Sequence, residues 1–118
     1  AFLSYPPMLT AGEAIEAIRR EAEDMDFAYY VYVVDENERL MGMMSLRELL
    51  VSPLDGRLED LMDTRIVSVN IEEDKKEIAN LFAKYGVMAI PVIDDDERMM
   101  GVIIFRNILE IIAPHLGK

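Results

Sequence analysis

The feature that most constrains this 118-residue chain is an internal repeat. Residues 33–50 read VVDENERLMGMMSLRELL and residues 92–109 read VIDDDERMMGVIIFRNIL, at a constant offset of 59 positions. Eight of the eighteen pairs are identical, among them Gly42 and Gly101. A repeat this long indicates one supersecondary unit built twice, and two such units usually bury their apolar faces against each other. We expect a pseudo-twofold module with a cleft between its halves, where small ligands bind.

Charge and composition narrow the classes of function. The chain has 23 Asp and Glu against 12 Lys and Arg, which gives a net charge of −11 at pH 7. Such a surface repels phosphate backbones, so we expect no general binding of nucleic acid. Acidic surfaces mostly serve solubility, and their other use is to attract divalent cations or basic partners. No apolar run approaches the roughly 20 residues that span a bilayer, and no secretory signal is visible.

The sequence lacks the motifs of common catalytic sites. It contains no Cys, which removes disulfides, thiolate metal sites and cysteine nucleophiles together. His115 is the single histidine, so one chain cannot build a histidine-based triad or a two-histidine metal site. We find no Gly-rich phosphate loop, zinc pattern or nucleophile elbow. The sequence therefore predicts that this chain is not an enzyme.

Periodicity predicts an α+β fold in which each unit contains a helix, two strands and a second helix. Helices are expected at residues 14–22, 46–51, 58–62, 72–85 and 105–112, and strands at residues 29–34, 39–45, 65–70, 88–93 and 99–104. The strand at 65–70 leads into the second unit and has no visible counterpart in the first. Gly42 lies inside an expected strand, where glycine weakens pairing unless another backbone or a ligand comes close.

Both halves share the pattern h-h-D-x-x-x-R-h-h-G-h-h-x-h-R-x-h-L, where h is apolar. The pattern and the order of elements resemble a pair of cystathionine-β-synthase-type (CBS) domains, the tandem arrangement called a Bateman module, over roughly residues 14–112. The segments YYVYVVDENERLMGMMSLRELL and IANLFAKYGVMAIPVIDDDERMMGVI are similar to the cytosolic CBS pair of MgtE-type magnesium transporters. The resemblance implies two β-α-β-β-α repeats related by a pseudo-twofold axis.

The same resemblance sets the expected boundaries. FLSYPP at residues 2–7 is similar to that family's junction with an N-terminal helical domain. Pro7 is followed almost directly by the first helix, which indicates that the leading strand of the first repeat is deleted or that a loop is absent from this sequence. The expected organisation is a junction at 1–9, a first repeat at 10–53, a linker at 54–60, a second repeat at 61–113 and a tail at 114–118.

An adenosine nucleotide is one candidate ligand. CBS pairs often use a Ser or Thr and a carboxylate three residues later to contact hydroxyl and ribose groups, and Ser45 and Glu48 have that spacing. The resemblance further implies that Arg47 meets phosphate. The base would lie between three more residues, Tyr32, Ile90 and Pro91.

A structural role explains the same spacing equally well. Ser45 can cap the following helix, and Glu48 three residues later can complete a capping box. Both interpretations stay open at this point. The second repeat carries Ile104 and Asn107 at the matching positions, so its site is expected to be empty.

Magnesium is the second candidate ligand, because it prefers hard oxygen ligands and retains several waters. Glu77 and Glu110 match acidic positions in the resembled family. Other matching positions carry residues that replace carboxylates or similar ligands: Lys76, Gly86, Arg106 and Asn107. The acidic run at Asp94–Glu97 is interpreted as a solvated hairpin turn rather than a metal site.

We therefore expect a regulatory, Mg²⁺-sensing fragment of an MgtE-like transporter, on the cytoplasmic face of the cell membrane. The alternative is an adenosine-nucleotide-binding regulatory module of another transporter or enzyme, with ATP or a related nucleotide as ligand. A purely structural dimerisation domain is the third hypothesis. The expected partners are the transmembrane and N-terminal helical domains of the same transporter. A second copy of the chain is also expected, through terminal-helix residues Leu49, Leu50, Ile108, Ile111 and Ile112.

Overall fold

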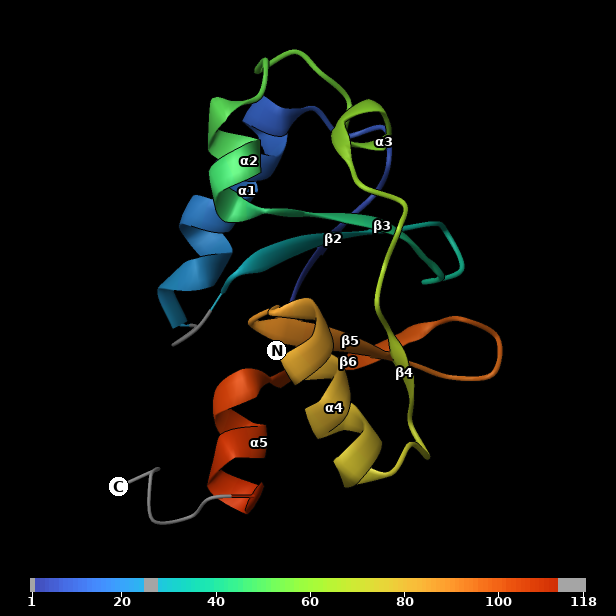
Figure 1. Cartoon of the computed structure of the whole chain (residues 1–118). Helices are drawn as coiled ribbons and strands as arrows, with labels where there is room; N and C mark the ends of the chain where they lie inside the picture. The colour runs from blue at the N-terminus through green and yellow to red at the C-terminus, as the bar shows by residue number, and fades with distance from the viewer. Residues whose placement is uncertain (1, 25–27, 113–118) are drawn as a thin grey trace. The chain divides into compact units, whose positions relative to one another are not determined.

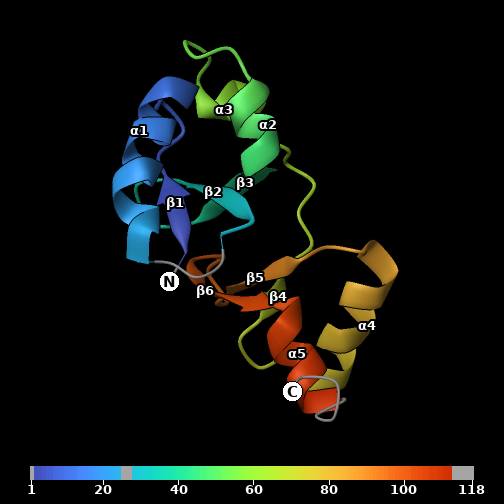
Figure 2. The ribbon, with the colours of Figure 1, turned by 90° about the vertical axis from the view of Figure 1, so that its left-hand side faces the viewer.

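The computed structural model of the chain describes residues 2–24 and 28–112. The fold consists of two compact units, Ala1–Ile66 and Val67–Lys118. Each unit has a three-stranded sheet with its helices on one face (Figures 1 and 2). This is the α+β fold class predicted from the repeat. No helix in residues 2–24 or 28–112 is long and apolar enough to cross a membrane.

The first unit contains one more strand than the sequence predicted. Its elements are β1 (Leu3–Tyr5), α1 (Ala11–Glu21), the 3₁₀-helix η1 (Ala22–Asp24), β2 (Tyr30–Val34), β3 (Leu40–Ser45), α2 (Leu46–Val51) and α3 (Leu58–Leu61). The strand order is β1-β2-β3, with β1 parallel and β3 antiparallel to β2. The leading strand of this repeat is therefore present, at Leu3–Tyr5. Of the two explanations expected for the short junction, deletion of this strand is wrong.

The second unit repeats this arrangement. Its elements are β4 (Val69–Asn70), α4 (Lys75–Tyr85), β5 (Ala89–Ile93), β6 (Met99–Ile104) and α5 (Phe105–Ile112). The strand order is β4-β5-β6, again with a parallel first pair and an antiparallel second pair. Both hairpins contain a register shift at the same place, between Val33 and Val34 in one and between Val92 and Ile93 in the other.

The expected strand at 65–70 is shorter in the structure. Only Val69 and Asn70 pair with β5, opposite Val92 and Ile93. In the first unit the ladder covers two earlier positions of the central strand, because Leu3 and Ser4 pair with Val31 and Tyr32 there. The residue of β5 that corresponds to Tyr32 is Pro91, which has no N–H to donate. The proline explains why the ladder between β4 and β5 stops early.

Each unit has its own apolar core between the sheet and its helices. The buried core of the first unit contains Leu3, Tyr5, Ala11, Ala14, Val31, Val33, Met44, Leu49 and Leu58. That of the second unit contains Val69, Ile78, Phe82, Ile90 and Ile108. In both sheets the contributing residues of the central strand alternate, as expected where one face of a strand packs against helices.

Helix ends are set by local hydrogen bonds. Thr10 caps α1 through a capping box: its Oγ1 accepts the N–H of Glu13 at 3.1 Å, and Glu13 Oε1 accepts the N–H of Thr10 at 3.0 Å. Asp74 caps α4 by accepting the N–H of Lys76 at 3.1 Å. Gly86 ends α4 with a φ of 62°, the left-handed conformation that glycine adopts without a Cβ penalty.

The prediction for Gly42 is confirmed. A Cβ at this position would lie 2.7 Å from Met62 Cγ and 3.0 Å from the carbonyl oxygen of Asp63. The backbone of Asp63 also pairs with Met43 on the outer edge of β3, with N–H···O distances of 3.0 and 2.8 Å. Glycine is therefore required here because another stretch of backbone comes close.

Candidate functional site

The proposed nucleotide-contacting pair occurs as a capping box at the start of α2. Glu48 N–H donates to Ser45 Oγ at 3.0 Å, and Ser45 N–H donates to Glu48 Oε1 at 3.0 Å. The structural interpretation of this spacing is therefore realised. Arg47 lies between them on the exposed side of the helix. Its guanidinium is accessible to an anion, as the nucleotide interpretation requires.

Tyr32 is the most unusual polar residue of the first unit. Its side chain is 2% exposed, and its hydroxyl has no hydrogen-bond partner in the described part of the chain. The aromatic rings of Phe2 and Tyr30 each pack edge-on to it, with centroids 6.4 Å away. Burial raises the pKa of Tyr32, and the neighbouring Tyr30 adds to the rise. An unpaired buried hydroxyl costs about 1–3 kcal/mol, so a polar ligand atom or a water that reaches it would be favoured.

Ile90 and Pro91 follow each other on β5 but point to opposite faces of its sheet. Ile90 is fully buried in the core of the second unit, among Ile78, Phe82 and Ile108. Its side chain therefore serves packing. Pro91 is also buried but is not part of that core cluster. Of Ile90 and Pro91, only Pro91 has its side chain on the face of the sheet that is turned away from the core of the second unit.

The predicted magnesium residues do not form a cluster. Glu77 lies exposed in the first turn of α4, and Glu110 lies on α5 with Arg106 Nε 3.8 Å from its Oε1. Across residues 2–24 and 28–112, no three acidic or imidazole side chains are grouped so that they could hold a metal ion. Any Mg²⁺ bound by these two carboxylates alone would keep most of its waters and bind weakly. His115 lies outside the described residues.

The two acidic hairpin turns are built from internal hydrogen bonds. Asp35 Oδ1 accepts the N–H groups of Asn37 and Arg39 at 2.8 and 2.9 Å. Asp94 Oδ1 accepts the two equivalent N–H groups, both at 2.9 Å. In each turn the third residue after the aspartate is a glutamate with positive φ, 66° and 65°. The structure agrees with the interpretation of Asp94–Glu97 as a solvated turn.

Asp94 is further held by a side chain. Arg98 Nε donates to its Oδ2 at 3.0 Å, and Arg98 NH2 donates to Asp96 Oδ2 at 3.1 Å. The pKa of Asp94 lies below its usual range, chiefly because the backbone N–H of Arg98 donates to the carboxylate, with the side chain of Arg98 and the N–H of Asp96 adding to the effect. The carboxylate of Asp94 therefore accepts hydrogen bonds from residues of its own turn.

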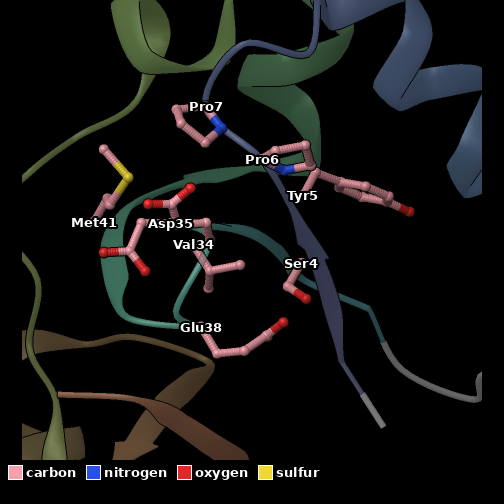
Figure 3. A pocket seen from close by; sticks show the side chains of 9 residues that line it. Ser4, Tyr5, Pro6, Pro7, Val34, Asp35, Glu38 and Met41 are labelled. Carbon is pink, nitrogen blue, oxygen red and sulfur yellow. The ribbon is translucent and has the colours of Figure 1, made fainter. Parts of the chain in front are cut away.

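A cavity that the sequence did not indicate lies at the far end of β2 from Ser45. It has a volume of about 540 Å³, and Figure 3 shows the side chains that line it. Its lining comes from the end of β1, the segment after it and the first hairpin: Ser4, Tyr5, Pro6, Pro7, Val34, Asp35, Glu36, Glu38 and Met41. None of the proposed nucleotide or metal residues lines it. Sequence reasoning missed it because one wall is β1, a strand that was not expected.

Tyr5 forms part of this wall but directs its hydroxyl elsewhere (Figure 3). The hydroxyl donates to Glu21 Oε2 at 2.6 Å and so ties β1 to the end of α1. Burial raises the pKa of Tyr5, and the bond to Glu21 raises it further. Tyr5 therefore acts as a structural link.

The sequence and the fold of this chain are both similar to those of known magnesium transporters. A 36% identical stretch of 104 residues occurs in the magnesium transporter MgtE of Thermus thermophilus; it covers 88% of this chain and 23% of the transporter. A crystal structure of the soluble part of a magnesium transporter matches with a TM-score of 0.91 at 31% identity, over 97% of this chain and 44% of that one. The cytosolic domain of the Mg²⁺ channel MgtE in complex with ATP matches with a TM-score of 0.90 at 34% identity, over 93% and 44%.

The chain thus spans about a quarter of the length of the transporter that it matches in sequence. The family model of the CBS domain matches twice, over residues 2–54 and 58–114. The first match includes β1, so the leading strand belongs to the repeat. On the two matches, together with the two equivalent sheets, this chain belongs to the CBS domain family and carries two copies of the domain in tandem.

Proposed function

We propose that this chain is the regulatory CBS pair of an MgtE-like magnesium transporter, on the cytoplasmic face of the membrane. The observation that carries the proposal is the likeness to magnesium transporters in sequence and fold over nearly the whole chain. The pair has a sensing role, and transport belongs to other segments of a longer polypeptide. No catalytic step is assigned to it.

Charge supplies a mechanism for sensing. A net charge of −11 on one subunit repels other acidic surfaces, and Mg²⁺ weakens that repulsion. Mg²⁺ therefore favours compact arrangements of the full protein, and its loss favours expanded ones that open the pore. Such a population shift requires Mg²⁺ to bind the compact arrangement better. Glu77 and Glu110 contribute as carboxylates that other domains of the transporter complete into sites.

The decisive experiment uses the full-length protein in vesicles loaded with a Mg²⁺-sensitive dye. Deleting residues 1–118 should leave transport intact and remove its dependence on Mg²⁺ at the cytoplasmic side. A deletion protein that is still inhibited by cytoplasmic Mg²⁺ would contradict the proposal. A substitution that reverses charge at Glu110, Glu110→Lys, should reduce the inhibition in the intact protein, and a matched reversal at Glu16 on α1 should not.

An adenosine nucleotide is the second candidate ligand, favoured by the unpaired buried hydroxyl of Tyr32. Within the first unit the nucleotide would contact Tyr32, Ser45, Arg47 and Glu48. Calorimetry with ATP on the Glu48→Ala variant tests it. Glu13→Ala is the matched control, because Glu13 has the same capping-box role at the start of α1. Equal ATP affinity in the two variants would leave Glu48 with a capping role alone.

We propose that the chain forms a homodimer. Fewer of the predicted residues are available for its interface than the sequence indicated. Leu49 is fully buried and Ile108 is 3% exposed, so both are core residues and their assignment to an interface was wrong. Leu50 is 65% exposed on α2, and Val51 beside it is also exposed. The side chains of Ile111 and Ile112 lie outside the described part. Light scattering of Leu50→Lys, with Leu54→Lys as an exposed control, should show loss of the dimer only in the former.

A further inference from the structure

The outer edge of β3 is occupied by the chain itself. After α3 the polypeptide turns extended, and Asp63 exchanges two backbone hydrogen bonds with Met43 (3.0 and 2.8 Å). The side chain of the residue before it, Met62, lies directly over Gly42 and packs against the core of the first unit. Two backbone bonds and one apolar side chain therefore close this edge.

The matching edge of β6 is open in the described part of the chain. Gly101 corresponds to Gly42, and apart from its two chain neighbours no atom of the described residues comes within 4 Å of a Cβ built on it. Val102 corresponds to Met43: it pairs with Pro91 as Met43 pairs with Tyr32. Since bonding alternates along an antiparallel pair, the N–H and C=O of Val102 point away from β5, as those of Met43 point away from β2. Met100 beside this edge is 53% exposed.

An open edge with unpaired backbone groups is a template for another extended segment. The internal repeat predicts where in the polypeptide such a segment lies. The segment that closes β3 precedes the leading strand β4, with Asp63 six residues before Val69. Val69 corresponds to Tyr5 of β1, because both pair with the same position of the central strand, Val92 and Val33. Counting back six residues from Tyr5 reaches the second residue upstream of Ala1.

We propose that the outer edge of β6 is the docking site of an extended segment immediately upstream of Ala1 in the same polypeptide. Two backbone hydrogen bonds to Val102 and an apolar side chain over Gly101 hold it. That side chain belongs to the third residue before Ala1, the counterpart of Met62. The inference rests on the proposed function only in that the chain is part of a longer protein.

Amide exchange of Val102, measured by NMR on isotope-labelled protein, tests the proposal. Three proteins are compared: residues 1–118, the same chain with about ten natural upstream residues, and the same chain with about ten natural downstream residues. The upstream residues should slow exchange at Val102 by about tenfold or more, since they add a hydrogen bond there. The amide of Met43, already paired with Asp63, is the internal control and should exchange equally in all three.

Two variants of the upstream-extended protein locate the contact. Gly101→Val should restore fast exchange at Val102, because its side chain fills the position of the docked apolar group. Replacing the third residue before Ala1 by Asp should do the same without touching β6. In the 118-residue protein, Gly101→Val should leave the melting temperature nearly unchanged, since nothing described lies within 4 Å.

Three results would overturn the proposal. The first is equal exchange at Val102 with and without the upstream residues. The second is protection by the downstream residues instead. The third is protection in the 118-residue protein that grows with concentration, which would identify a second copy as the occupant. None of these results depends on Mg²⁺, so failure here is separate from failure of the magnesium-sensing role.

Discussion

Two glycines that are identical in the repeat have different surroundings. Gly42 lies under Met62 and Asp63, and Gly101 faces open space in the described part. Gly42→Ala should therefore lower the free energy of unfolding by about 1–3 kcal/mol through overpacking. Gly101→Ala in the 118-residue chain should change it by less than about 1 kcal/mol and can raise it, because alanine restricts the unfolded chain. Urea denaturation of both variants measures the difference; equal losses would contradict it.

Tyr32 gives a second test at this scale. Removing its unpaired hydroxyl in Tyr32→Phe should raise the free energy of unfolding of the ligand-free protein by about 1 kcal/mol, because a buried polar group without a partner is costly. Tyr30→Phe is the control, since Tyr30 is only half-buried and already has an interaction partner. A Tyr32→Phe protein that is less stable than the parent would mean that the hydroxyl is paired in solution.

Among the structural elements, the β5–β6 hairpin has a predictable pH dependence. The pKa of Asp94 is lowered in the folded chain, so its contribution to stability is present above the unfolded pKa and is lost as pH falls through the folded pKa. Asp94→Asn should therefore flatten the acid limb of the stability curve as the pH falls below the usual pKa of an aspartate, about 3.9. Denaturation at a series of pH values checks this. Asp95 does not accept these backbone N–H groups of the turn, so Asp95→Asn should leave the acid limb of the stability curve unchanged.

Local and non-local elements were predictable from sequence to different extents. The bounds of α2, β6 and α5 agree with the prediction. The capping box of Ser45 sets the start of α2, and the turn held by Asp94 sets the start of β6. The leading strands did not agree: β1 was missed, and β4 is two residues long rather than six. Their pairing with the central strand is non-local, and for β4 it depends on a proline more than twenty residues away.

The candidate site follows the same division. The Ser45–Glu48 spacing was legible from sequence because a capping box spans four residues. The side chain of Ile90 packs in the core, and that of Pro91 lies on the opposite face of the sheet. This difference follows from the direction of β5 in its sheet. The cavity beside Pro6 and Pro7 depends on β1, so it was beyond the reach of local patterns.

For the molecule as a whole, the dispersed carboxylates predict a weak response to Mg²⁺. Stabilisation by a ligand grows as RT ln(1 + [L]/Kd), so Mg²⁺ near its Kd adds under about 1 kcal/mol. Millimolar Mg²⁺ should raise the melting temperature of the 118-residue protein slightly more than NaCl of equal ionic strength, and Glu110→Gln should remove the excess. If the excess is absent from the parent protein as well, Mg²⁺ acts on these residues by screening alone, and the proposed sensing role would require other domains of the transporter.

The capping box of α2 has a thermodynamic consequence. Ser45 and Glu48 are each other's partners in two bonds that hold the first turn of the helix, so a ligand that displaces either side chain from its partner breaks one of these bonds. α2 is only six residues long, and a helix of that length depends on its cap. Occupancy at these residues would then be linked to fraying of α2, which carries the exposed Leu50. A ligand bound at these residues would change the surface through which we propose that a second copy binds.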